Sequence, residues 1–164
     1  MWRCIPYLQG GSVGIENASG AFLNLTTNTD QGIMWRAVLE AIGYDYIYVA
    51  DMYRNAGCNL DRIVVTEGGS KSSLWNQIKA DMLGSEVVTL ENVEGAVLSD
   101  AILAAYAVGD IHDLKKALLD VVKVKKVYTP NKENTKFYRE MFKIQQQIIR
   151  NDMKSVFNQL EKMR

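Results

Sequence analysis

The fold is decided by the stretch IVVTEGGSKS, residues 63–72. Its first residues are apolar and β-branched, which predicts a strand over 62–66 that is covered on both faces. Two glycines follow, and Ser70 or Ser72 can cap a helix that runs through Met82. Glycines let a backbone or a phosphate come close, and a helix N-terminus presents unpaired N–H groups and the positive end of a dipole. The stretch therefore predicts either an anion-binding loop or a tight strand-to-helix turn without a ligand.

The same alternation of elements continues after this helix. A strand is expected over 86–90, and a helix rich in small residues is expected from about Val93 to Val108, stopping at Gly109. The order strand, helix, strand, helix predicts a parallel sheet in an α/β fold. A short helix and an extended segment follow over 110–127. After Pro130 we expect a terminal helix whose apolar face comprises Phe137, Met141, Ile144 and Ile148.

The segment before residue 62 differs in character. Residues 1–28 are rich in Gly, Asn and Ser, which predicts irregular loops with one or two strands. Thr29 or Asp30 can then cap a long helix that ends near Gly57.

Composition excludes several classes of protein. The chain has 164 residues, of which 48% are hydrophobic and 23% charged, as in an average globular domain. Lys and Arg number 19, equal to Asp and Glu, so the basic excess of a nucleic-acid-binding protein is missing. No apolar run reaches the ~18 residues of a membrane span. Cys4 and Cys58 show no ligand spacing, so we expect reduced thiols and a cytoplasmic location.

Residues 66–84 read TEGGSKSSLWNQIKADMLG and resemble the adenosine-binding segment of the FGGY carbohydrate kinases, where GGGAKSxLWxQxxADxLG follows a strand. Residues 94–105, EGAVLSDAILAA, resemble the ExxALGAAILAA helix of this family. Upstream, GAFLNL at 20–25 and RAVLEA at 36–41 resemble its RGxFxGL and RAVLEG segments, and PYL at 6–8 resembles its PYLxGER lead-in. The resemblance covers nearly the whole chain and points to xylulokinase-like and gluconokinase-like members.

This resemblance implies an actin-like ATPase fold of the ribonuclease-H-like type, with a mainly parallel sheet flanked by helices and a long C-terminal helix. Family members have two domains and bind ATP and sugar in the cleft between them. The catalytic base, an aspartate, and most sugar contacts belong to the N-terminal domain. We therefore expect residues 1–164 to be the C-terminal, ATP-binding domain without its opening strands, and without a catalytic residue. The activity implied is that of an ATP-dependent sugar kinase, with this chain alone inactive.

Carried over by position, the resemblance implies nucleotide contacts at Gly68, Gly69 and Ser70, with Ser73 and Asn76 near the adenosine. The loop amides would face the phosphates, and the helix side chains would approach the purine. The cofactors implied are ATP and Mg²⁺, and no protein ligand is assigned to the metal. A sugar or polyol substrate would bind only together with the N-terminal domain, and xylulose, gluconate and other polyols or sugar acids all remain open.

Some positions depart from the family pattern. Asn24 stands where the family usually has glycine, and Gly10-Gly11-Ser12 replaces the GER triplet. Ser99-Asp100 replaces Gly-Ala in the LGAA motif. An aspartate there could repel phosphates or require a partner of its own.

Two hypotheses follow. The chain is the C-terminal part of a sugar kinase, active with its other half, or a non-catalytic remnant or assembly module of the same fold that binds nucleotide weakly or not at all. In either case, a sheet without its opening strands has unpaired edges and exposed apolar surface, which predicts self-association or poor solubility of the isolated chain.

Overall fold

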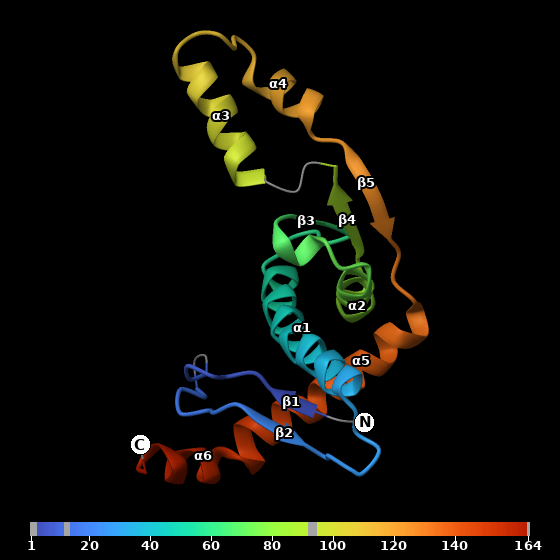
Figure 1. Cartoon of the computed structure of the whole chain (residues 1–164), viewed down its shortest axis with the longest axis vertical. Coiled ribbons are helices and arrows are strands. Elements are labelled where there is room, and N and C mark those ends of the chain that lie inside the picture. The colour runs from blue at the N-terminus through green and yellow to red at the C-terminus, as the bar shows by residue number, and fades with distance from the viewer. Residues whose placement is uncertain (1–2, 12–13, 92–94, 164) are drawn as a thin grey trace. The chain divides into compact units, whose positions relative to one another are not determined.

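The computed structural model describes residues 3–11, 14–91 and 95–163. The chain forms two compact units (Figure 1). One unit combines the residues up to Cys58 with those from Lys132 onward, and the other comprises Asn59–Asn131. The glycine loop predicted to bind anions therefore lies in the second unit.

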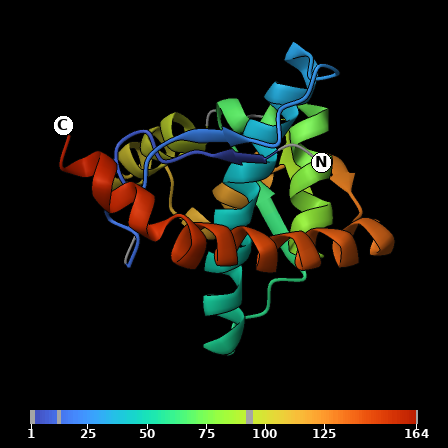
Figure 2. The same ribbon diagram turned by 90° about the horizontal axis from the view of Figure 1, so that it is seen from below.

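The first unit is built from two short strands and helices from both ends of the chain. Strands β1 (Arg3–Ile5) and β2 (Ala21–Leu23) pair antiparallel, and the long helix α1 (Gln31–Asn55) follows. Helix α5 (Lys132–Gln147), a π-helical turn (Ile148–Asp152) and α6 (Lys154–Glu161) form the C-terminal rod seen in Figure 2. The predicted loops, strands and long helices of this unit are thus confirmed.

The boundaries of α1 follow from local chemistry. The carboxylate of Asp30 accepts a hydrogen bond of 2.8 Å from the Ile33 amide, so Asp30 is the N-cap.

One buried cluster of this unit joins β1, the loop after it and the C-terminal rod. Its members are Ile5, Ile15, Ala18, Ile149 and Phe157.

The buried face of α5 differs from the predicted one. Phe137 and Ile144 are 41% and 45% exposed, whereas Tyr138 and Gln145 are buried. Two hydrogen bonds to other elements explain this difference. The Tyr138 hydroxyl donates to the Glu40 carboxylate at 2.9 Å, and the Gln145 side-chain amide donates to the Cys4 carbonyl at 3.2 Å. These bonds fix the rotation of α5, so the prediction from apolar spacing was wrong by one position.

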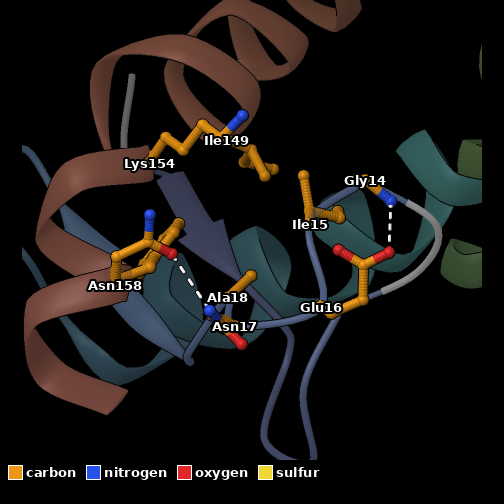
Figure 3. A pocket seen from close by; sticks show the side chains of 9 residues that line it. Gly14, Ile15, Glu16, Asn17, Ala18, Ile149, Lys154 and Asn158 are labelled. Carbon is orange, nitrogen blue, oxygen red and sulfur yellow. Dashed lines mark hydrogen bonds between the residues drawn. The ribbon is translucent and has the colours of Figure 1, made fainter. Parts of the chain in front are cut away.

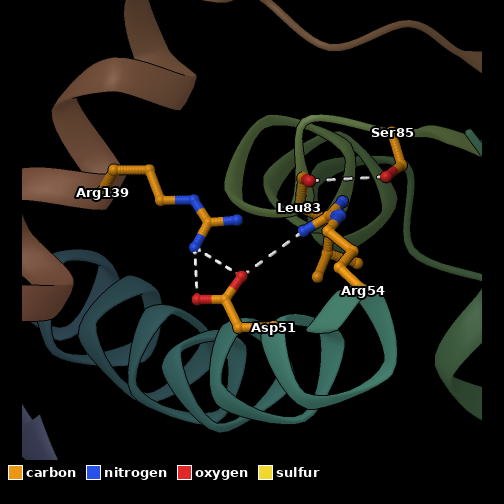
Figure 4. Close-up of polar contacts among 5 residues, drawn as sticks. All are labelled: Asp51, Arg54, Leu83, Ser85 and Arg139. Atoms are coloured by element: carbon orange, nitrogen blue, oxygen red, sulfur yellow. Dashed lines mark hydrogen bonds and ion pairs between the residues drawn. The ribbon is translucent and has the colours of Figure 1, made fainter. Parts of the chain in front are cut away.

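An ion pair also joins α5 to α1. Arg139 Nη1 donates to both carboxylate oxygens of Asp51, at 2.6 and 2.8 Å (Figure 4). Arg54 Nη1 lies 3.6 Å from the same carboxylate. About a third of the Asp51 and Arg139 side chains is exposed, so water screens the pair and its contribution to stability is ~0–1 kcal/mol.

The second unit is a three-stranded sheet with helices. In chain order it contains β3 (Arg62–Val65), a 3₁₀ turn (Gly68–Ser70), α2 (Ser73–Leu83), β4 (Glu86–Leu90), α3 (Gly95–Ala107), α4 (Leu114–Val121) and β5 (Val124–Tyr128). Strands β3 and β4 are parallel, as the pattern predicts, while β5 pairs antiparallel with β4. The predicted helix start at Val93 and Glu94, like Ser12 in the first unit, lies outside the described residues.

Two features of this sheet place the loop. Helix α2 crosses over between the parallel strands, is capped by Ser72 and ends at Gly84, whose φ of 62° suits glycine. Strand β3 is an edge of the sheet of described strands, and its Val64 is 52% exposed. The prediction of a strand covered on both faces was therefore wrong for β3.

Candidate nucleotide-binding loop

The loop between β3 and α2 is a single 3₁₀ turn over Gly68–Ser70. The Ser70 amide donates to the Glu67 carbonyl at 3.0 Å, and the Lys71 amide donates to the Gly68 carbonyl at 3.3 Å. Within the described part of the chain, the amides of Gly68 and Gly69 have no hydrogen-bond acceptor. Both glycines are exposed. The loop thus presents two adjacent donors to a ligand, just before a helix N-terminus.

The surface of the loop is open at Gly68. A Cβ atom placed there would have no heavy atom within 4 Å. A Cβ atom on Gly69 would instead lie 3.7 Å from Lys79 Nζ and 3.9 Å from Trp75 Nε1, at ordinary contact distance. Gly68 therefore faces open space, while Gly69 lies against α2.

Side chains beneath the loop hold its shape. Asn76 is fully buried, and its Nδ2 donates to the Ser70 carbonyl at 2.7 Å. The Ser70 hydroxyl, also buried, donates to the Glu67 carbonyl at 2.7 Å. Lys79 Nζ donates to the Gly69 carbonyl at 3.1 Å. Each of these three carbonyls therefore accepts a hydrogen bond from a side chain beneath the loop, and these bonds orient the peptide groups of the loop.

The five residues carried over from the family pattern fall into two groups. Gly68, Gly69 and Ser73 are exposed, whereas Ser70 and Asn76 are buried and support the loop. The Ser73 hydroxyl accepts a hydrogen bond of 3.1 Å from the Tyr128 hydroxyl at the end of β5. Tyr128 and Lys79 were not identified from the sequence. A lysine on the buried face of a helix is the signal that could have identified Lys79.

Glu67, at the entrance of the loop, has an unusual backbone. Its φ of 60° and ψ of −163° lie in a region that is almost restricted to glycine. Asn24, with φ 62°, is the other residue besides glycine with positive φ among the described residues. Both stand where the quoted FGGY patterns have glycine, so at these two positions the backbone suits glycine but the side chain does not.

A cleft of about 420 Å³ lies beside the loop in the same unit. Its lining is mostly apolar and comprises Thr66, Glu67, Leu90, Gly95, Leu98, Ser99, Ile102, Leu118, Val121 and Val122. The Ser99 hydroxyl donates to the Gly95 carbonyl at 2.7 Å, so it is bound within α3. Asp100 is exposed and does not line the cleft. The substitution at Ser99 therefore faces the cleft, and that at Asp100 faces solvent.

A second hollow, in the first unit, is too small for a nucleotide. Its volume is about 50 Å³, and residues 14–18 line it together with parts of the C-terminal rod (Figure 3). Asn17 Nδ2 donates to Asn158 Oδ1 at 3.0 Å across it, and the Gly14 amide donates to Glu16 Oε1 at 2.7 Å. This space suits water molecules rather than an organic ligand.

Among the residues that the structure describes, no group of three or more His, Cys, Asp or Glu side chains could hold a metal ion. Over the same residues, no helix is long and apolar enough to cross a membrane.

Comparisons with known proteins match the chain to one family. Residues 5–108 match the FGGY family of carbohydrate kinases, C-terminal domain. A xylulose kinase of Staphylococcus epidermidis is 30% identical over 145 residues, which are 87% of this chain and 29% of that protein. A gluconokinase of Bacillus subtilis is 32% identical over 142 residues, 85% of this chain and 28% of that protein.

Solved structures show the same fold. Ligand-bound xylulose kinase from Lactobacillus acidophilus superimposes with a TM-score of 0.78 at 28% identity, covering 97% of this chain and 32% of that one. Glycerol kinase from Plasmodium falciparum gives a TM-score of 0.74 at 20% identity, covering 89% of this chain and 30% of that one. The fold is therefore that of the sugar kinases, the actin-like ATPase fold.

The chain belongs to the FGGY family of carbohydrate kinases, and it matches the family's C-terminal domain. It spans about 29% of the length of the curated xylulose kinases that it matches.

Proposed function

We propose that this chain is the nucleotide-binding, C-terminal part of an ATP-dependent carbohydrate kinase of the xylulokinase type. The reaction is transfer of the ATP γ-phosphate to a hydroxyl group of a sugar or polyol. The observation that carries the proposal is the pair of exposed Gly68 and Gly69 amides without an acceptor among the described residues, next to the N-terminus of α2.

The residues of the loop take different roles in this proposal. The Gly68 and Gly69 amides donate to phosphate oxygens, which helix N-termini favour through unpaired N–H groups and the positive dipole end. Ser73, exposed on the first turn of α2, contacts the adenosine. Ser70 and Asn76 hold the loop from below through the bonds to the Glu67 and Ser70 carbonyls.

Phosphoryl transfer depends on position and charge stabilisation, and a catalytic base must orient the acceptor hydroxyl. We assign no base to the described residues of this chain. By the family resemblance, the base and most sugar contacts belong to the N-terminal domain, so activity and sugar binding require that domain. Mg²⁺ accompanies ATP, and phosphate oxygens are among the ligands it prefers.

A second candidate function is supported by Glu67. A carboxylate now borders the cleft, on a backbone that suits glycine, and Ser99 lines the same cleft. Like charge near the phosphates weakens binding. These two substitutions favour a remnant that binds nucleotide weakly or serves only in assembly.

Calorimetric titration of the whole chain with MgATP separates the two candidates. A Cβ added at Gly68 would have no heavy atom within 4 Å, so a tryptophan side chain can project from this position into the open space above the loop. We expect saturable binding by the wild type, weaker binding by Gly68→Ala and none by Gly68→Trp, with unchanged circular dichroism. Absence of binding by the wild type would favour the remnant. Equal binding by Gly68→Trp would refute the assignment of the site to this loop.

A further inference from the structure

Lys79 is a buried lysine on α2, at a position that the quoted FGGY pattern leaves unspecified. Only 5% of its surface is exposed. Its ammonium group lies directly behind the glycine loop, where Nζ is 3.1 Å from the Gly69 carbonyl oxygen and 3.5 Å from Asn76 Oδ1. It also lies over the Trp75 ring, 4.9 Å from the centroid.

These contacts satisfy the hydrogens of the ammonium group but not its charge. The Gly69 carbonyl, the Asn76 amide oxygen and the Trp75 ring are all neutral groups. Within the described residues, no carboxylate forms an ion pair with Lys79. Buried charges in proteins are normally paired, because removal of an ion from water is costly.

The pKa of the Lys79 ammonium agrees with an unpaired charge. Burial lowers this pKa below its ordinary value, and no carboxylate among the described residues counteracts the shift. The position of the charge is specific as well, since Lys79 contacts the carbonyl of Gly69, and the amide of the same residue, in the preceding peptide group, is one of the two donors without an acceptor among the described residues. An anion bound to that amide would lie close to the ammonium group.

We infer that Lys79 is a positioning residue of the nucleotide loop, which holds the Gly69 carbonyl in place and whose charge is balanced by the phosphates of the bound nucleotide. This inference rests on the proposed nucleotide site and extends it to a residue beyond the family pattern. A neutral side chain of similar shape should keep the loop but lose the attraction for phosphate. The ligand's charge, rather than its base or ribose, then determines how much affinity is lost.

The test compares a charged and an uncharged ligand. MgADP and adenosine are titrated into the wild-type chain, Lys79→Met, Lys79→Arg and the control Lys71→Met, which removes an exposed lysine from the same segment. We expect Lys79→Met to weaken MgADP binding about tenfold. Loss of one unit charge about 10 Å from the phosphates has an effect of this size at an effective dielectric constant of about 20. Adenosine affinity should stay unchanged, Lys79→Arg should retain MgADP affinity, and Lys71→Met should lose less than Lys79→Met.

Each other outcome is decisive. Equal loss of adenosine and MgADP in Lys79→Met would show a merely structural lysine and overturn the inference, as would an equal loss of MgADP in Lys71→Met. Unchanged MgADP affinity in Lys79→Met would refute the inference and leave the proposed function intact. Absence of MgADP binding by the wild type would refute both.

A variant-free measurement covers the case in which Lys79→Met does not fold. Inorganic tripolyphosphate, which carries only the anionic part of the ligand, should displace MgADP from the wild-type chain. Failure of tripolyphosphate to compete, at concentrations where MgADP binding is saturable, would overturn the inference.

Discussion

Glu67→Gly should stabilise the chain, although the change removes a side chain. Glu67 has φ 60° and ψ −163°, a conformation in which the Cβ of an L residue is strained. Such a conformation costs a residue other than glycine about 1–3 kcal/mol. Relief of this strain is partly offset, by about 0.4–1 kcal/mol, because glycine makes the unfolded chain more flexible. The expected net stabilisation is therefore about 0.5–2 kcal/mol.

The reference for this change is Glu67→Ala, because Glu67 also has side-chain interactions that both variants remove. Alanine keeps the strained Cβ and loses the carboxylate, so the difference between the glycine and alanine variants isolates the backbone. The assay is urea denaturation followed by circular dichroism. With a urea dependence of about 2 kcal/mol per molar, the midpoint of the glycine variant should lie ~0.3–1 M above that of the alanine variant.

An equal midpoint, or a lower one for glycine, would refute the reasoning. It would mean that the backbone at this position is not strained in solution. A change in the urea dependence itself would instead indicate altered compactness of one state, so both quantities must be fitted.

Three further predictions concern stability and assembly. Burial raises the pKa of Asp45, which accepts from the Tyr7 hydroxyl at 2.8 Å, so its contribution to stability is lost as pH rises from the ordinary carboxyl range through the raised pKa. Asp45→Asn should therefore make the free energy of unfolding depend less on pH. The prediction is contradicted if the urea midpoints of Asp45→Asn at pH 4 and pH 7 differ by as much as those of the wild type. Asn76→Ala leaves the buried Ser70 carbonyl without its donor and should cost about 1–3 kcal/mol of unfolding free energy in the same assay, whereas a loss below about 0.5 kcal/mol would count against a supporting role. The half-exposed Val64 on the edge strand β3 predicts self-association, which sedimentation velocity should reveal as a concentration-dependent coefficient and which a monomer at every concentration would contradict.

Local signals in the sequence were enough for most elements. Asp30 and Ser72 are found as helix caps and Gly84 as a helix end, because capping depends on side-chain oxygens and left-handed backbone within a few residues. The parallel pairing of β3 and β4 follows from the strand-helix-strand order. The predicted glycine loop also lies between β3 and α2, as expected.

Features that depend on distant partners could not be predicted. The rotation of α5 is set by bonds from Tyr138 and Gln145 to α1 and β1, which apolar spacing does not encode. The antiparallel direction of β5 depends on how α3 and α4 return the chain to the sheet. Lys79 lies between apolar positions of α2, and only the structure shows its contact with Gly69. The strain at Glu67 is visible only in backbone angles.

The central claim is that nucleotide binds at the amides of Gly68 and Gly69. Amide NMR of the isotope-labelled whole chain, titrated with MgADP, tests it most directly. We predict that the Gly68 and Gly69 resonances shift most and saturate together, with smaller shifts at Ser73. Two results would contradict this assignment. One is that the Gly68 and Gly69 resonances stay unchanged at MgADP concentrations that saturate the shifts of other residues. The other is that no resonance of the chain shifts at all.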